Sequence, residues 1–154
     1  MPVHDWTRVS AETFHDRIVA MIEVLSPGNK SSRHAIRPLL DKDIKDPESI
    51  INLLLVDVYP PGPRDPNGIH GALWNEIGTE EYILGRERPL TAVAYLGGTV
   101  VQTFVNHFVV GEPIPEKPLF LTRENFIRVP LEEAYMAAWE DVPPQYQEIL
   151  RASS

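Results

Sequence analysis

The stretch INLLLVDVY, residues 51–59, is apolar at nearly every position. A strand that is buried on both faces shows this pattern, which is common in parallel sheets. Two further β-rich runs, residues 89–96 and 99–110, flank the pair Gly97-Gly98. Paired glycines accept the positive φ angles of a tight turn, so the pattern predicts a β-hairpin near residues 89–110.

Residues 10–25 fit two different structures. Apolar residues recur at helical spacing from Phe14 to Leu25, behind Ser10, which could cap a helix. The part that starts at Arg17 is also short, rich in Ile and Val, and followed by Ser-Pro, as expected of a buried strand. The spacing alone leaves both structures open.

If residues 17–25 are a strand, they form a right-handed βαβ unit with residues 51–59. The crossover would contain a helix that begins at Ser31 or Ser32 and ends near Ile44. The expected fold class is therefore α/β (α+β): a mixed sheet with a βαβ unit, a β-hairpin and C-terminal helices.

Helical spacing predicts three more helices, one after the turn-rich loop PPGPRDPNG and two near the C-terminus. The expected buried residues are Ile69, Leu73 and Ile77 in the first, Leu131, Ala134, Tyr135, Ala138 and Trp139 in the second, and Tyr146, Ile149 and Leu150 in the third.

The length of 154 residues indicates one domain. We expect an N-terminal segment at residues 1–16 and a single α/β domain at residues 17–154.

No signal peptide and no membrane-spanning run is recognisable, so a cytoplasmic location is expected. Cysteine is absent, which excludes disulfides and thiolate chemistry. The net charge of -8 disfavours nucleic-acid binding.

Two carboxylates are candidates for a metal site. In the strand interpretation, Glu23 and Asp57 both lie near the C-terminal ends of parallel strands, where open α/β sheets usually place their sites. Two such carboxylates could hold Mg²⁺, with Lys30 or Arg33 nearby to neutralise a phosphate. The structural alternative is that Glu23 and Asp57 cap loops or form ion pairs. In the helical alternative, Glu23 is a solvated surface residue.

Other polar residues have weaker signals. Lys30 and Arg33, at the start of the crossover helix, could bind an anion, although SPGNKSS lacks the glycines of a P-loop. His70, at a predicted helix start beside Arg64 and Asp65, is the best placed histidine for general acid–base work, and its structural alternative is a hydrogen bond to the preceding loop. His107 is expected to be a hydrogen-bonded sheet histidine.

Several separated motifs carry a family resemblance: IEVLSPGNKSSR, LLLVDVYPPGPRDPNGIHGALW, PLFLT and VPLEEAYMAAW, together with MPVHDWTRV and TFHD near the start. They resemble the bacterial family called domain of unknown function 4058, for which the resemblance implies no established activity. Relative to that family, the chain looks shortened before the IEVLSP strand. The shortening would leave a sheet edge uncovered, which favours either a homodimer or an unstable chain.

EVLSP is also similar to a motif of the Uma-type, restriction-endonuclease-like proteins. That similarity implies an acidic residue on one strand and an E-x-K pair on the next. Glu23 matches the glutamate, but Leu25 stands where the pattern has lysine, and the upstream acid would have to be Asp16. We therefore expect a degenerate or non-catalytic restriction-endonuclease-like domain without a cofactor. The alternative is an Mg²⁺-dependent nuclease or phosphodiesterase that uses Glu23, Asp57 and Lys30.

Overall fold

The structure is a computed structural model that describes residues 18–25, 51–63, 65–77 and 80–152. In chain order, its elements are β1 (Ala20–Val24), β2 (Asn52–Asp57), α3 (Gly68–Ile77), β3 (Leu90–Leu96), β4 (Gln102–Phe108), β5 (Lys117–Phe120), β6 (Phe126–Val129), α4 (Leu131–Glu140) and α5 (Pro144–Ala152).

A mixed four-stranded sheet has the strand order β1-β2-β3-β4. β1 is parallel to β2, whereas β2, β3 and β4 pair antiparallel. The expected fold class is confirmed, as is the strand interpretation of residues 20–24. The predicted crossover helix and the boundary at residues 1–16 lie outside the described residues.

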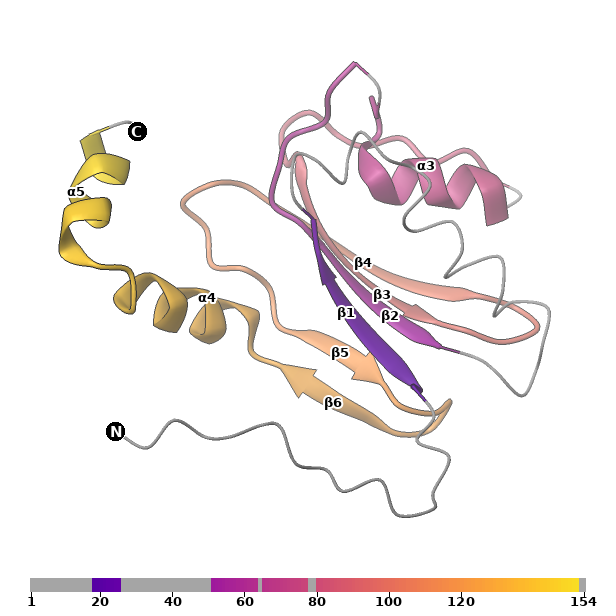
Figure 1. The fold of residues 1–154 in the computed structure, drawn as a ribbon. Helices are drawn as coiled ribbons and strands as arrows, with labels where there is room; N and C mark the ends of the chain where they lie inside the picture. The colour runs from indigo at the N-terminus through magenta and orange to yellow at the C-terminus, as the bar shows by residue number, and fades with distance from the viewer. Residues whose placement is uncertain (1–17, 26–50, 64, 78–79, 153–154) are drawn as a thin grey trace, which may run out of the picture.

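The sheet is covered on both faces. Figure 1 shows α3 against one face and the β5–β6 hairpin against the other. Every residue of β2 and of β3 is consequently buried, and these are the two central strands. The continuous apolar pattern of residues 51–59 thus reflects burial on two faces.

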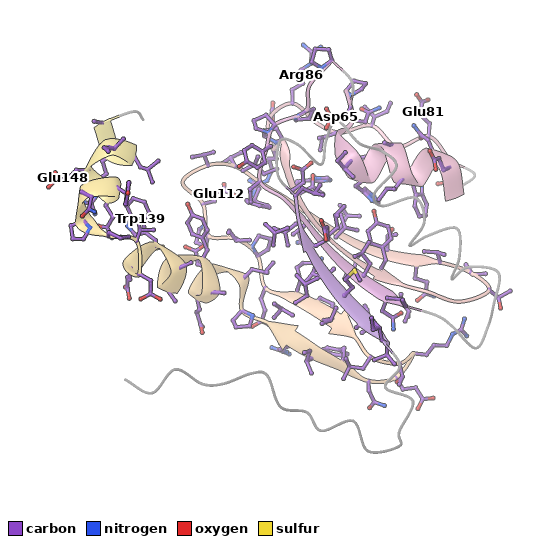
Figure 2. All side chains as sticks on the ribbon, viewed as in Figure 1. Asp65, Glu81, Arg86, Glu112, Trp139 and Glu148 are labelled. Carbon is purple, nitrogen blue, oxygen red and sulfur yellow. The ribbon has the colours of Figure 1, made fainter. Side chains whose placement is uncertain are left out.

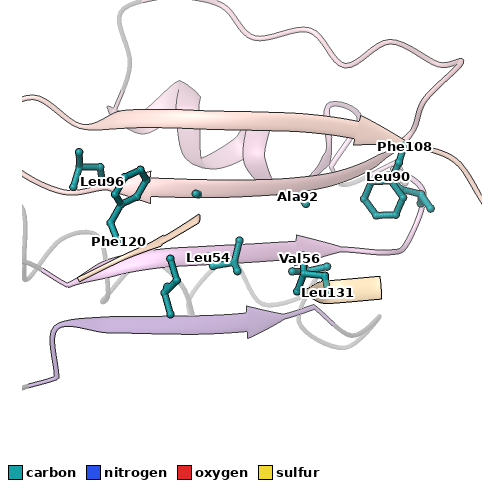
Figure 3. Packing of buried hydrophobic residues seen from close by; sticks show 10 residues of the cluster. Leu54, Val56, Leu90, Ala92, Leu96, Phe108, Phe120 and Leu131 are labelled. Atoms are coloured by element: carbon teal, nitrogen blue, oxygen red, sulfur yellow. The ribbon is translucent and has the colours of Figure 1, made fainter. Parts of the chain in front are cut away.

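Two apolar cores result, one on each face. The core on the β5–β6 face, shown in Figure 3, is formed by Leu54, Val56, Leu90, Ala92, Ala94, Leu96, Phe108, Leu119, Phe120 and Leu131. The core on the α3 face is formed by Leu25, Leu53, Leu55, Ile69, Leu73, Val93 and Tyr95.

The predicted hairpin is confirmed by β3 and β4, which pair from Leu90↔Phe108 to Leu96↔Gln102. Five residues, 97–101, connect the strands, so the turn is longer than a two-residue one. Gly98 has a φ of 153°, where L side chains are rare, and a Cβ there would lie 2.7 Å from Arg123 Nη2. The backbone conformation is therefore the reason that favours glycine here, since the Arg123 side chain is flexible and could move away from a Cβ.

The second hairpin, β5–β6, is not anticipated by the hydrophobic pattern. β6 is exposed at three of its four residues, so it lacks the alternation that marks a half-buried strand. β5 contributes Leu119 and Phe120 to the core. β6 is held in place by its antiparallel pairing with β5.

The three predicted helices are present as α3, α4 and α5. α3 buries Ile69 and Leu73 as expected, and the side chain of Ile77 lies outside the described residues. The expected burial along the C-terminal helices is wrong. α4 buries only Leu131, and α5 buries none of its residues.

Figure 1 shows the physical reason, because α4 and α5 extend away from the sheet instead of lying across it. Their apolar side chains at Tyr135, Tyr146, Ile149 and Leu150 remain between 51% and 59% exposed. No helix in the described part of the chain has the length and apolar character that a membrane crossing requires.

Candidate functional site

Glu23 and Asp57 lie on the same face of the sheet, the one that α3 covers. Glu23 pairs with Leu55 in the parallel β1–β2 register, and Asp57 follows two residues later on β2. Residues two apart in a strand share a face, so the two carboxylates are diagonal neighbours. The predicted placement near the C-terminal ends of adjacent parallel strands is confirmed.

The environments of the two carboxylates differ. Asp57 is 3% exposed, and its Oδ1 accepts a hydrogen bond of 3.1 Å from the Tyr59 N–H. Glu23 is half-buried on β1, the first strand of the sheet. Asp57 thus caps the loop that follows β2, as expected if this carboxylate has a structural role.

Leu25 occupies the position where the nuclease pattern has lysine. It is 2% exposed and packs with Leu53, Leu55 and Ile69 in the core on the α3 face. Its N–H also donates to the Val56 carbonyl over 2.9 Å. The residue is fixed by both its side chain and its backbone, and it brings no charge to Glu23.

The remaining members of the predicted site are not described. Asp16, Lys30 and Arg33 lie outside the described residues. Within the described ranges, no group of three or more histidine, aspartate or glutamate residues is arranged to hold a metal ion.

Next to Asp57, a row of polar residues crosses three strands. Asp57 pairs with Thr91 on β3, and Thr91 pairs with His107 on β4. The Thr91 Oγ1 lies 3.4 Å from His107 Nδ1, and the Tyr82 hydroxyl lies 3.1 Å from His107 Nε2. Both ring nitrogens of His107 have partners, which confirms the expected hydrogen-bonded sheet histidine.

His70 lies on α3 above this row. It is 3% exposed, and its Nδ1 lies 2.5 Å from the Tyr95 hydroxyl. The Tyr82 ring packs edge-on against the imidazole at a centroid distance of 4.6 Å. His70 is therefore held by a structural hydrogen bond, but its partner is Tyr95 on β3 and not the preceding loop that the alternative expected. Its acid–base role stays a prediction.

Burial sets the protonation states in this cluster. Burial first, and then the nearby His107, lowers the pKa of His70 from 6.5 to about 4. Burial and the neighbouring Tyr82 raise the pKa of the Tyr95 phenol, and burial raises the pKa of Tyr82 to about 12. At neutral pH the Tyr95 O–H is thus a donor and the His70 Nδ1 an acceptor.

On the opposite face, Lys117 at the start of β5 is only 2% exposed. Its Nζ donates to the Phe104 carbonyl over 2.5 Å and to Asn106 Oδ1 over 2.9 Å. Burial lowers the pKa of Lys117 to about 8. The two acceptors partly replace the water that the ammonium loses on burial.

The sequence did not single out Thr91, Tyr82, Tyr95 or Lys117. The contact between Thr91 and His107 is a consequence of the hairpin register, because the pairing of Leu90 with Phe108 also places Thr91 opposite His107. Tyr82 and Lys117 come from a loop and from an unpredicted hairpin, so spacing along the chain gives no signal for their contacts.

The His70 imidazole is expected to titrate near pH 4, because the folded protein buries it without a negative partner among the contacts described. ¹H–¹³C NMR of the Cε1–H groups measures this midpoint, with His70→Gln to assign the signal. In the unfolded chain, His70 takes up its proton near pH 6.5. The contribution of the neutral His70 to the free energy of unfolding is therefore complete above pH 6.5 and is lost as the pH falls towards 4. The expected loss is about 3 kcal/mol. A His70 midpoint near 6.5 would contradict the buried, neutral imidazole.

Comparisons with known proteins add no assignment. No protein-family model matches the chain, and neither the curated proteins nor the solved structures contain a match to it. The resemblance to the domain of unknown function 4058 family and to Uma-type proteins therefore stays a prediction.

Proposed function

We propose that the chain is a degenerate restriction-endonuclease-like domain of a bacterial family, cytoplasmic, without a cofactor, and acting by binding instead of catalysis. The observation that carries this proposal is Leu25, a core leucine two residues after Glu23. A nuclease of this pattern needs a cation at that position to stabilise the charge that develops on phosphate.

The neighbouring polar groups support the same proposal. His70 and His107, the histidines on this face in the described part of the chain, hydrogen-bond to Tyr95, Tyr82 and Thr91. A general base must reach the proton that it abstracts, and a 3% exposed His70 does not offer that access. The net charge of -8 also opposes the approach of a nucleic acid.

The second candidate is an Mg²⁺-dependent nuclease or phosphodiesterase that uses Glu23, Asp57 and Lys30. One observation favours it: Glu23 and Asp57 share a face at the ends of adjacent parallel strands. Mg²⁺ is commonly held by one or two carboxylates, with water and phosphate oxygens as its other ligands. In this candidate, Lys30 would supply the charge that Leu25 lacks.

Isothermal calorimetry with Mg²⁺ and Mn²⁺ separates the two candidates. We expect no saturable binding tighter than about 1 mM, and the same result for Glu23→Gln, because two diagonal carboxylates bind a divalent ion weakly when no third ligand joins them, and none does among the described residues. Glu80→Gln, at an exposed position in the segment that follows α3, is the matched control.

The binding proposal fails if wild type binds Mn²⁺ saturably, Glu23→Gln abolishes that binding, and Glu80→Gln does not. Metal-dependent cleavage of single- or double-stranded DNA by wild type, lost in Glu23→Gln, would establish the second candidate.

The partner that we propose is a second copy of the chain, paired through β1. β1 is an edge strand of the described sheet. Its residues Ile22 and Val24 are 44% and 60% exposed, and the nearby Ile18 is 59% exposed. Exposed apolar edge strands favour pairing with another chain. On the opposite edge strand, β4, the Lys117 ammonium donates hydrogen bonds to the Phe104 carbonyl and to Asn106 Oδ1. A positive charge at a strand edge opposes pairing with another chain.

Light scattering coupled to size-exclusion chromatography tests this pairing. We expect a dimer for wild type and a folded monomer for Ile22→Lys, because a charge on the exposed side of β1 opposes association without entering the core. Ile83→Lys, at a 71% exposed position, should remain dimeric. A wild-type monomer, or equal dissociation by both substitutions, would rule out the β1 edge as the interface.

A further inference from the structure

An open hollow of about 490 Å³ lies where β2 and β4 end, beside the start of α4. Its size falls within the range of small-molecule sites, which are mostly apolar with a few polar groups. It is on the face opposite to Glu23 and His70, so it is a separate feature of the molecule.

The floor of the hollow is part of the packed core. Leu90 and Phe108 are direct partners in the β3–β4 register, each 3% exposed, and both line it. They belong to the core that β5 and α4 complete. A ligand would therefore meet a packed apolar surface that does not have to form on binding.

The walls are held by polar contacts. Glu132 Oε2, on the first turn of α4, accepts a hydrogen bond of 2.8 Å from the Ile114 N–H, which ties the loop at residues 109–114 to the helix. On the same loop, Glu112 forms an ion pair with Arg88, whose Nε donates to the His107 carbonyl over 3.0 Å. In Figure 2, Glu112 lies on the loop that faces α4.

The lining combines aromatic rings with negative charge. Tyr59, Phe108 and Tyr135 contribute to it, together with the carboxylates of Glu112 and Glu132. None of the described lining residues is basic. Aromatic faces and carboxylates both attract cations, whereas an anionic ligand would meet the negative charge of Glu132. The charge of Glu112 is already balanced by Arg88, so Glu132 is the carboxylate that selects the ligand.

From this combination, we propose that the hollow binds a small organic cation with an apolar body, of the quaternary ammonium class. The methyl groups of such a cation contact Leu90 and Phe108, and its charge lies between the Tyr135 ring and the Glu132 carboxylate. Quaternary ammonium carries no N–H, so it does not compete for the bond between Glu132 and the Ile114 N–H. This binding is independent of the proposed degenerate nuclease site and of the β1 interface.

Choline and its neutral isostere 3,3-dimethylbutan-1-ol provide the direct test, since they differ in charge but hardly in shape. Titrations followed by methyl NMR of the full chain should show saturable shifts for Leu90 and Ile114 with choline. The neutral alcohol should bind about 10-fold more weakly, the difference expected when a cation meets an aromatic ring and a carboxylate.

Two variants on α4 make a matched pair. Glu132→Gln removes one charge from the lining yet keeps an oxygen that can accept from Ile114, and it should weaken choline binding about 5-fold. Glu133→Gln makes the same change in net charge at an exposed position outside the lining, and should change binding less than about 2-fold. Tyr135→Leu, at a 57% exposed residue, should weaken choline but not the neutral alcohol.

Equal affinity for choline and the alcohol would overturn the assignment and leave only an apolar hollow. Equal weakening by Glu132→Gln and Glu133→Gln would show that choline responds to overall charge instead of to this site. Absence of shifts at Leu90 and Ile114 up to the solubility limit of choline would also overturn it.

Discussion

Burial of strand β2 on both faces is the constraint on which the other elements depend. Each residue from Asn52 to Asp57 is buried, so the chain must supply a cover for each face and a partner for each edge. α3 covers one face, the β5–β6 hairpin covers the other, and β1 and β3 pair with the two edges. Buried polar ends of the strand also need partners. Asn52 meets this need by donating to the Val19 carbonyl and accepting from the Gly97 N–H.

This arrangement limits where chemistry can occur. Leu25 is drawn into the core on the α3 face because it follows β1 directly and lies against β2 through the bond to Val56. The place where a nuclease carries its lysine is thereby used for packing. On the same face, His70 and His107 are occupied by hydrogen bonds to Tyr95, Tyr82 and Thr91. On the other face, an open hollow lies beside α4.

The parts of the fold with a strong local pattern could be predicted from the sequence. The apolar run at residues 51–59 identified β2, and the Gly97-Gly98 pair located the hairpin. The acids Glu23 and Asp57 were correctly placed near the C-terminal ends of parallel strands. The rest depends on tertiary contacts. An amphipathic pattern shows that α5 has an apolar side but not whether anything covers it, and Tyr146 is in fact 56% exposed. The contacts of Tyr82 and Lys117 arise from distant segments, for which local spacing has no signal.

The most direct test of the account is the free energy of unfolding of Leu25→Lys, measured by urea denaturation against Leu25→Met. If position 25 belongs to the core, the lysine variant should lose at least about 3 kcal/mol, because a charge is buried without a partner built for it. The methionine variant should lose less than about 1.5 kcal/mol, since it keeps the volume of the side chain. Similar stability of both variants would contradict the account, since it would mean that position 25 can hold a cation beside Glu23, as an active nuclease requires.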